Sequence, residues 1–137
     1  MSDAVADVQQ RIDEFFPGTI GIRITEAFPD RVVAAVDVTR GLCTVPGVMH
    51  GGAVMALADT LGGVATSLNI QPGYGTTTIE SKTNFFAPGV EGTTVTAECV
   101  PLHRGRRTMV WETRVLGADG RLLAKVTQTQ IVLEPRS

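Results

Sequence analysis

The sequence has few of the residues on which disulfide-bonded domains and zinc sites depend. Only two of its 137 residues are cysteines, Cys43 and Cys99, which is too few for a disulfide framework. Neither cysteine stands at a spacing typical of metal ligands, so no metal site is predicted. We expect two free, buried thiols in a reducing compartment.

Charge is also scarce, and the two signs nearly balance. Charged residues make up 19% of the chain, below the roughly 25% typical of soluble domains. Lys and Arg number 12 against 14 for Asp and Glu, a formal net charge of −2. A general nucleic-acid binder is therefore excluded, because it needs a basic surface to neutralise phosphates. With 43% apolar residues, disorder is excluded as well, and part of the surface is expected to be covered in an oligomer.

Leader and membrane-spanning segments are not expected. Residues 1–7 lack the basic start and apolar core of a signal peptide. The longest apolar stretch, Ala53 to Leu68, has 16 residues and contains Asp59 and two glycines, whereas a spanning helix needs about 20 apolar residues. These features predict a soluble, cytoplasmic protein without membrane contact, formed as a single domain over residues 1–137.

The hydrophobic pattern predicts a short N-terminal helix, two strands, a central helix and four further strands. Apolar residues recur at helical spacing from Asp3 to Phe16, before Pro17-Gly18, and again from Gly51 to about Leu68. Alternating apolar positions predict strands, of which the first two form a hairpin. The expected strands are 19–26, 32–38, 76–86, 93–102, 107–116 and 121–133.

This order of elements predicts an α+β fold with an antiparallel sheet. Among the 39 residues between Arg40 and Glu80, only Asp59 carries a formal charge. A central helix with so little charge must be covered on most sides, and one strongly curved antiparallel sheet wrapped around it would provide that cover.

Asp59 is the residue that most strongly suggests chemistry. A carboxylate on a buried helix is costly unless it is hydrogen-bonded or used. Its helical neighbours include Met55, Gly62 and Gly63, and small residues let a ligand or another backbone come close. The alternative is a polar rim position bonded to loop amides, and the residues alone leave both interpretations open.

The central helix begins with His50-Gly51-Gly52. The first N–H groups of a helix have no partner within it and carry the positive end of its dipole. Glycine has no Cβ to keep a substrate oxygen away from them, so this helix start could polarise a carbonyl. Alternatively, the glycines only shape the turn into the helix. His50 could be a base, but a structural hydrogen bond is the favoured interpretation.

Two segments carry a family resemblance. Residues 48–60, Val-Met-His-Gly-Gly-Ala-Val-Met-Ala-Leu-Ala-Asp-Thr, resemble the central-helix motif of hotdog-fold acyl-CoA thioesterases, most closely the phenylacetate-degradation (PaaI-like) branch. Residues 77–88, with Phe85-Phe86 and the closing Pro88, resemble the strand after that helix. In element order the resemblance covers residues 15–133. It implies a hotdog fold that hydrolyses an acyl-CoA to a free acid and coenzyme A, with no cofactor beyond the coenzyme A of the substrate.

The resemblance also implies roles for single residues. Gly51 would donate its N–H to the thioester carbonyl, Asp59 would be the general base or the nucleophile, and Thr78 matches a Ser or Thr near the attacking water. Seven residues before Gly51 the family usually has Asn or Gln, whereas this chain has Thr44, whose hydroxyl is shorter and has fewer donors. This departure motivates an alternative, a non-catalytic acyl-CoA-binding protein. An enoyl-CoA hydratase is disfavoured, because five residues after Asp59 stands Val64 instead of a histidine.

The one dense basic cluster is His103-Arg104-Gly105-Arg106-Arg107, at a predicted hairpin turn. Two interpretations are open. The cluster is either a solvated turn or a site where Arg104, Arg106 and Arg107 bind the phosphates of coenzyme A, since the guanidinium fork suits phosphate oxygens.

Helix geometry predicts that one chain cannot complete the site. Gly51 and Asp59 are eight residues apart, so they are separated by about 12 Å along the helix axis and by a rotation of about 80°. Two antiparallel copies of the helix would bring Gly51 of one chain near Asp59 of the other. The resemblance implies the same arrangement, since hotdog thioesterases form dimers with two shared sites, commonly paired into tetramers. We expect a homodimer with shared sites, paired into a homotetramer.

Overall fold

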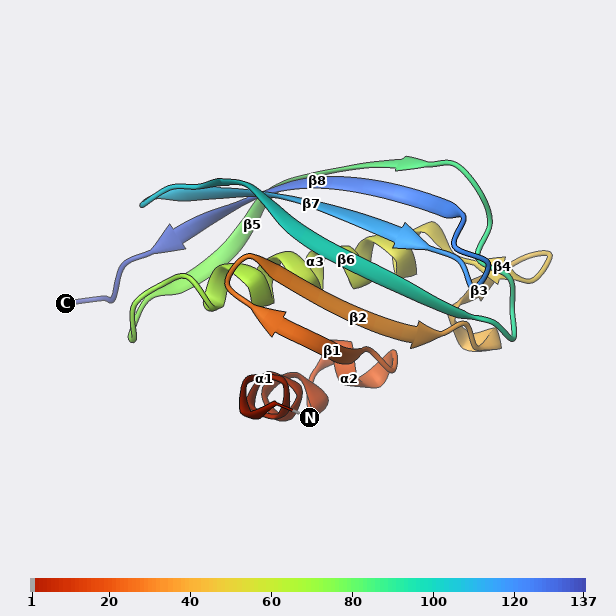
Figure 1. Cartoon of the computed structure of the whole chain (residues 1–137), viewed down its shortest axis with the longest axis horizontal. Coiled ribbons are helices and arrows are strands. Elements are labelled where there is room, and N and C mark those ends of the chain that lie inside the picture. The colour runs from red at the N-terminus through yellow and green to blue at the C-terminus, as the bar shows by residue number, and fades with distance from the viewer. Residues whose placement is uncertain (1) are drawn as a thin grey trace.

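The computed structural model describes residues 2–137. Its main elements are a curved six-stranded sheet and a long helix, α3 (Gly51–Ser67), that lies along the inner face of the sheet (Figure 1). The sheet is antiparallel, as predicted, with strand order β1-β2-β6-β7-β8-β5. The predicted α+β fold is therefore confirmed. The six strands are β1 (Arg23–Phe28), β2 (Arg31–Asp37), β5 (Gly75–Phe85), β6 (Thr94–Arg104), β7 (Thr108–Leu116) and β8 (Leu122–Leu133).

The N-terminal helical segment is broken in two, where one helix over 3–16 was predicted. Helix α1 (Asp3–Asp13) begins at Ser2, whose hydroxyl accepts a hydrogen bond from the Val5 amide (3.2 Å), and α2 (Phe16–Thr19) follows. Pro17 explains the break, because its ring would clash with the carbonyl four residues earlier, that of Asp13, if the helix continued. The first strand consequently begins at Arg23, later than predicted.

The two edges of the sheet differ. At the β1 edge, the side chain of Gln9 on α1 takes the place of a neighbouring strand. Its Nε2 donates to the Ile22 carbonyl (3.0 Å) and its Oε1 accepts from the Ile24 amide (2.7 Å). The opposite edge is β5, eleven residues long, and no strand of residues 2–137 pairs with its outer side. A long unpaired edge is a place where another chain can add.

Helix α3 packs one face against the sheet. Leu57, Ala58 and Leu61 are fully buried there, and fully buried Trp111 of β7 donates from Nε1 to Thr66 Oγ1 (2.9 Å). The prediction that the helix is covered on most sides is wrong for a single chain. Its outer face is uncovered, and Gly52, Met55 and Asp59 are exposed there.

A small hairpin before α3 was not predicted. Strands β3 (Cys43–Thr44) and β4 (Val48–Met49) pair with each other, after a 3-10 turn at Arg40–Leu42. Both cysteines are free; Cys99 is buried as expected, whereas Cys43 is only half-buried. Burial raises the pKa of the Cys99 thiol to about 12, so it stays protonated and is a poor nucleophile. Within the described residues, no helix is long and apolar enough to cross a membrane.

Candidate active site

The start of α3 leaves one of its two glycine amides free. His50 is the N-cap, and its Nδ1 accepts a hydrogen bond from the Gly52 amide (2.7 Å). A Cβ on Gly52 would lie 2.9 Å from that nitrogen, so Gly52 serves the cap and its N–H is not free for a substrate. The Gly51 N–H makes no hydrogen bond to any residue from 2 to 137. The structure thus gives His50 a structural role and leaves Gly51 as the carbonyl-binding candidate.

Asp59 and Thr78 are brought together, as the resemblance implies. Thr78 Oγ1 on β5 lies 2.5 Å from Asp59 Oδ1, to which it can donate, and Gln128 Nε2 on β8 lies 3.5 Å from the same oxygen. The sheet register shifts between Thr78 and Glu80, and such bulges re-aim side chains. The partners of Asp59 are strand side chains, not the loop amides of the rim alternative.

Two buried glutamines near Asp59 were not predicted from the sequence. Gln128 and Gln130 are each 1% exposed, and Gln130 Oε1 lies 2.5 Å from the Thr78 hydroxyl. A signal existed, because on the predicted strand 121–133 these glutamines share the face of Ala124 and Val126, which is the apolar face. Polar residues in the core-facing register of a strand are uncommon enough to mark a site.

Asp59 also borders a groove of about 660 Å³ between α1 and α3. Apolar side chains supply much of its wall, and Gly63 borders it with open space where a Cβ would stand. A groove of this size with a few polar groups is typical of a site for a small organic ligand. Its apolar lining residues are Val8, Ile12, Pro17, Val64 and Leu68, and its polar and charged ones are Asp7, Arg11, Asp59, Thr60, Ser67 and Thr76.

Comparison with known proteins decides the family. Residues 46–124 match the family model described as "Thioesterase superfamily". This chain belongs to the thioesterase superfamily. The predicted hotdog thioesterase fold and the predicted class of enzyme, a thioester hydrolase, are thereby confirmed at the level of the family.

Individual proteins and solved structures are similar to this chain. The 1,4-dihydroxy-2-naphthoyl-CoA hydrolase of Escherichia coli (strain K12) is 30% identical over 116 residues, which is 85% of each chain. The crystal structure of the thioesterase HI1161 from Haemophilus influenzae has a TM-score of 0.92 at 26% identity, covering 100% of this chain and 95% of that one. A hypothetical thioesterase from Streptococcus pneumoniae TIGR4, solved with coenzyme A, has a TM-score of 0.80 at 24% identity, covering 97% and 99% of the two chains.

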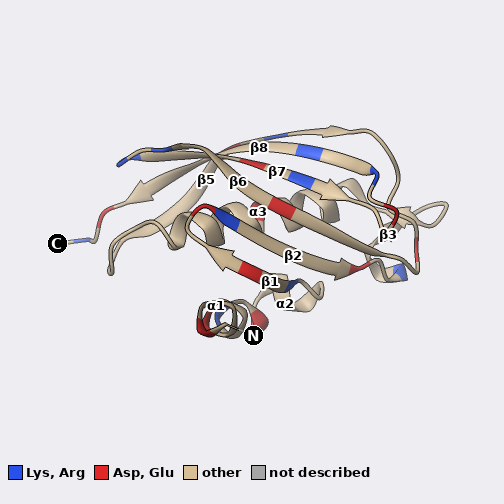
Figure 2. Cartoon of the chain, viewed as in Figure 1, with Lys and Arg blue, Asp and Glu red and all other residues tan. Residues whose placement is uncertain are grey.

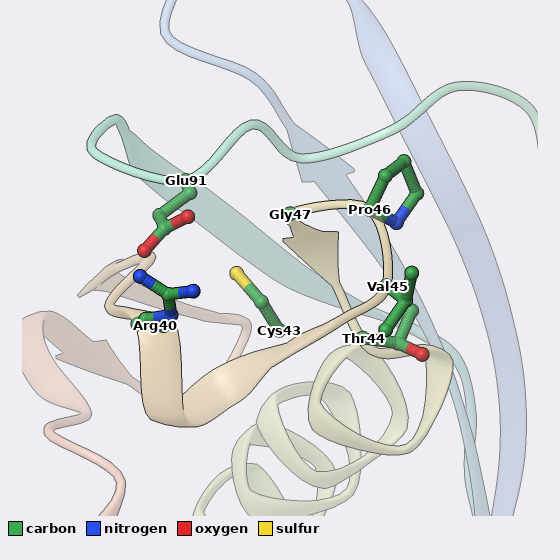
Figure 3. Close-up of a pocket in the computed structure, with 7 residues that line it drawn as sticks. All are labelled: Arg40, Cys43, Thr44, Val45, Pro46, Gly47 and Glu91. Atoms are coloured by element: carbon green, nitrogen blue, oxygen red, sulfur yellow. The ribbon is translucent and has the colours of Figure 1, made fainter.

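Thr44 makes no hydrogen bond to Asp59, whose partners are Thr78 and Gln128. It is exposed on the β3–β4 hairpin, beside a pocket of about 330 Å³ that Arg40, Cys43 and Glu91 also line. Figure 3 shows the Thr44 hydroxyl pointing away from these three side chains. Desolvation and the charge of Glu91 raise the pKa of the Cys43 thiol, so the pocket offers no activated nucleophile.

The basic cluster lies far from Gly51 in the same chain. Arg104, Arg106 and Arg107 stand at the tip of the β6–β7 hairpin, at the end of the molecule opposite β3 (Figure 2). Arg104 donates to Asn69 Oδ1 (3.5 Å), just beyond the C-terminal end of α3. The 17 residues of α3 span about 25 Å, so one chain does not bring the cluster to the Gly51 amide.

Proposed function

We propose that the protein hydrolyses an acyl-CoA or aryl-acyl-CoA thioester to a free acid and coenzyme A. The observation that carries this proposal is the Asp59 carboxylate, bonded to Thr78 and bordering an apolar groove, on a helix that starts with the free Gly51 amide. A carboxylate, a carbonyl-binding N–H and an apolar groove are what such a hydrolysis needs. Membership of the thioesterase superfamily and likeness to a naphthoyl-CoA hydrolase support it.

In the proposed reaction, Asp59 takes a proton from water, and the water oxygen attacks the thioester carbonyl carbon. The carbonyl oxygen becomes negative and is stabilised by the Gly51 N–H and the positive end of the α3 dipole. The C–S bond then breaks, and the coenzyme A sulfur leaves and receives the proton held by Asp59. Alternatively, Asp59 attacks the carbonyl carbon itself and the C–S bond breaks, so that coenzyme A leaves as the thiolate. Water then hydrolyses the acyl-aspartyl anhydride to the free acid and regenerates the Asp59 carboxylate, and one of the released protons goes to the thiolate.

His50 is assigned a different task. Because its Nδ1 is already an acceptor for the Gly52 amide, a neutral His50 imidazole carries its proton on Nε2. It can therefore donate a hydrogen bond to the substrate, but it is not the proposed base.

The proposed active unit is a homodimer with shared sites, paired into a homotetramer. The uncovered face of α3 and the free β5 edge lie next to each other, since β5 supplies Thr78 to Asp59. Large apolar side chains are exposed on and just after this strand: Ile79, Phe85 and Phe86 are 57%, 54% and 57% exposed. Their burial against a second copy would stabilise the dimer and would bring Gly51 of one chain toward Asp59 of the other.

The same dimer would bring the basic cluster to the substrate. With the two α3 helices antiparallel, the C-terminal end of one helix, where Arg104 contacts Asn69, lies beside the N-terminal end of its partner. The arginines of one chain would then bind the phosphates of a coenzyme A whose thioester lies on Gly51 of the other chain. The coenzyme A in the Streptococcus pneumoniae structure supports this ligand class for the fold.

Replacing Arg104, Arg106 and Arg107 together by Ala is expected to raise KM about tenfold with a smaller change in kcat, because phosphate contacts remote from the thioester contribute to binding. Added salt should shrink the difference, since exposed charges are screened. The control replaces Arg114, Arg121 and Arg136 by Ala, which removes as many exposed cations elsewhere. An unchanged KM at low ionic strength would exclude the cluster as a phosphate-binding site and would favour the interpretation that it is a solvated turn.

A substrate panel tests the proposed function. Release of free coenzyme A thiol is measured with fatty acyl-CoAs and aryl-acyl-CoAs, phenylacetyl-CoA included because of the resemblance to the PaaI-like branch. Turnover of at least one class is expected. Thr44 in place of the family's amide favours the second candidate, a non-catalytic acyl-CoA-binding protein, and tight binding without turnover across the panel would select it.

A further inference from the structure

The side-chain amide of Gln128 on β8 lies directly against Gly62 of α3. Gln128 projects from β8 against Gly62 of the helix, and a Cβ on Gly62 would overlap the Gln128 carboxamide. Gly62 is a helical neighbour of Asp59 in the sequence, but it is buried and does not belong to the exposed face around Asp59. The missing side chain of Gly62 therefore makes the space that Gln128 fills.

The hydrogen bonds of this amide lead to Asp59. Gln128 Nε2 has two protons; it lies 3.0 Å from Gln130 Oε1 and 3.5 Å from Asp59 Oδ1. Gln130 Nε2 donates to Thr76 Oγ1 (3.1 Å), whose own proton goes to the Ile131 carbonyl (2.9 Å). This series of hydrogen bonds determines which end of each amide is oxygen and which is nitrogen, because a reversed Gln130 would place its NH₂ group against the NH₂ group of Gln128.

The carbonyl oxygen of the Gln128 amide, in contrast to its NH₂ group, makes no hydrogen bond to the described residues. This oxygen, Oε1, is buried. Burying an unpaired amide oxygen costs stability, so packing alone does not account for a glutamine at this position. An apolar side chain of similar size would fill the same space without that cost.

We propose that Gln128 is a positioning residue for Asp59, an inference that rests on the proposed function. Thr78 from β5 and Gln128 from β8 can both donate to Asp59 Oδ1. These two contacts orient the carboxylate so that its other oxygen, Oδ2, faces the substrate. The single Thr78 proton has two acceptors at 2.5 Å, Asp59 Oδ1 and Gln130 Oε1. Gln130 thus keeps Thr78 hydrogen-bonded when Asp59 holds the proton taken from water.

The first test replaces Gln128 by Met, which has a similar volume and no donor. We expect kcat to fall about 10-fold or more with KM changed less than about twofold, because a misdirected base slows the chemical step but leaves binding intact. The control is Thr113→Val, which removes an equally buried polar atom, Thr113 Oγ1, that lies beside the Cys99 thiol and is not bonded to Asp59. This control should keep wild-type kcat.

The second test separates packing from positioning. Gly62→Ala should lower both the melting temperature and kcat, because the new methyl group displaces the Gln128 amide. Adding Gln128→Ala removes the overlap, so the double variant should regain melting temperature relative to Gly62→Ala without regaining kcat. Recovery of kcat together with melting temperature would overturn the proposal, as would wild-type kcat in Gln128→Met. If all Gln128 variants fail to fold while Thr113→Val folds, Gln128 is a structural residue and the proposal is equally overturned.

A spectroscopic measurement keeps this inference distinct from the proposed function. The carboxyl ¹³C resonance of Asp59 should move in Gln128→Met and stay in place in Thr113→Val, whether or not any thioester is hydrolysed. If the wild-type protein hydrolyses no substrate of the panel but the resonance moves in Gln128→Met, the proposed function is wrong, whereas the contact between Gln128 and Asp59 is supported. An unmoved resonance in an active enzyme overturns the positioning role alone.

Discussion

Asp59→Asn is expected to lower kcat by about 10²–10⁴-fold, the usual contribution of a positioned base. An amide can neither take a proton from water nor attack a carbonyl. The fold should persist, because Asn has nearly the same volume and its oxygen can still accept from Thr78 and Gln128, the two donors next to Asp59 Oδ1. The measurements are steady-state turnover on the best substrate of the panel and the melting temperature.

The control for this prediction makes the same chemical change elsewhere. Asp119 lies in the turn between β7 and β8, where its Oδ1 accepts from the Arg121 amide (3.0 Å), and Asp119→Asn should leave kcat unchanged. Near-wild-type turnover in a folded Asp59→Asn variant would remove Asp59 from the mechanism and favour the acyl-CoA-binding alternative.

The helices and strands that could be predicted are those long enough for their hydrophobic pattern to repeat several times. The central helix was expected from Gly51 to about Leu68 and runs from Gly51 to Ser67. The last four strands were each placed within about two residues. The β3–β4 hairpin was missed because its strands have two residues each, too few for any alternation to appear. The split between α1 and α2 depended on one residue, Pro17, acting on the carbonyl of Asp13.

In the candidate site, residues that stand out locally in the sequence could be predicted, whereas contacts between residues far apart in the sequence could not. Asp59 could be singled out because charge is absent around it, and Gly51 because it starts the helix. The contact between Gln128 and Gly62 joins residues that are 66 positions apart in the sequence. The neighbouring residues of neither one indicate this contact. The exposure of Asp59 in one chain was not predicted either, since the apolar character of α3 is the same whether a sheet or a second molecule covers it.

The second prediction with a large effect concerns the Gly51 amide. Gly51→Pro removes this N–H and should lower kcat by about 10²–10³-fold, as loss of one donor to a developing oxyanion does. Proline is favoured at the first position of a helix, and His50 before it already has the extended backbone that proline requires (φ −62°, ψ 138°). Gly51→Ala adds the same Cβ, 3.1 Å from Phe85 Cζ, and keeps the N–H, so it measures the loss of kcat that the Cβ alone causes. The further loss in Gly51→Pro is then due to the missing N–H.

Mixing the two inactive proteins then tests whether the site is shared between chains. In a heterodimer of Gly51→Pro and Asp59→Asn chains, one site has both defects and the other has an intact Gly51 and an intact Asp59. Random re-pairing of equal amounts gives half heterodimers, each with one of two sites intact, so about a quarter of wild-type activity should return. Mass spectrometry of isotopically labelled chains measures how many mixed dimers form. If mixed dimers form and no activity returns, or if the active species is a monomer, then Gly51 and Asp59 act within one chain, and the separation of about 12 Å along α3 must be bridged by the substrate itself.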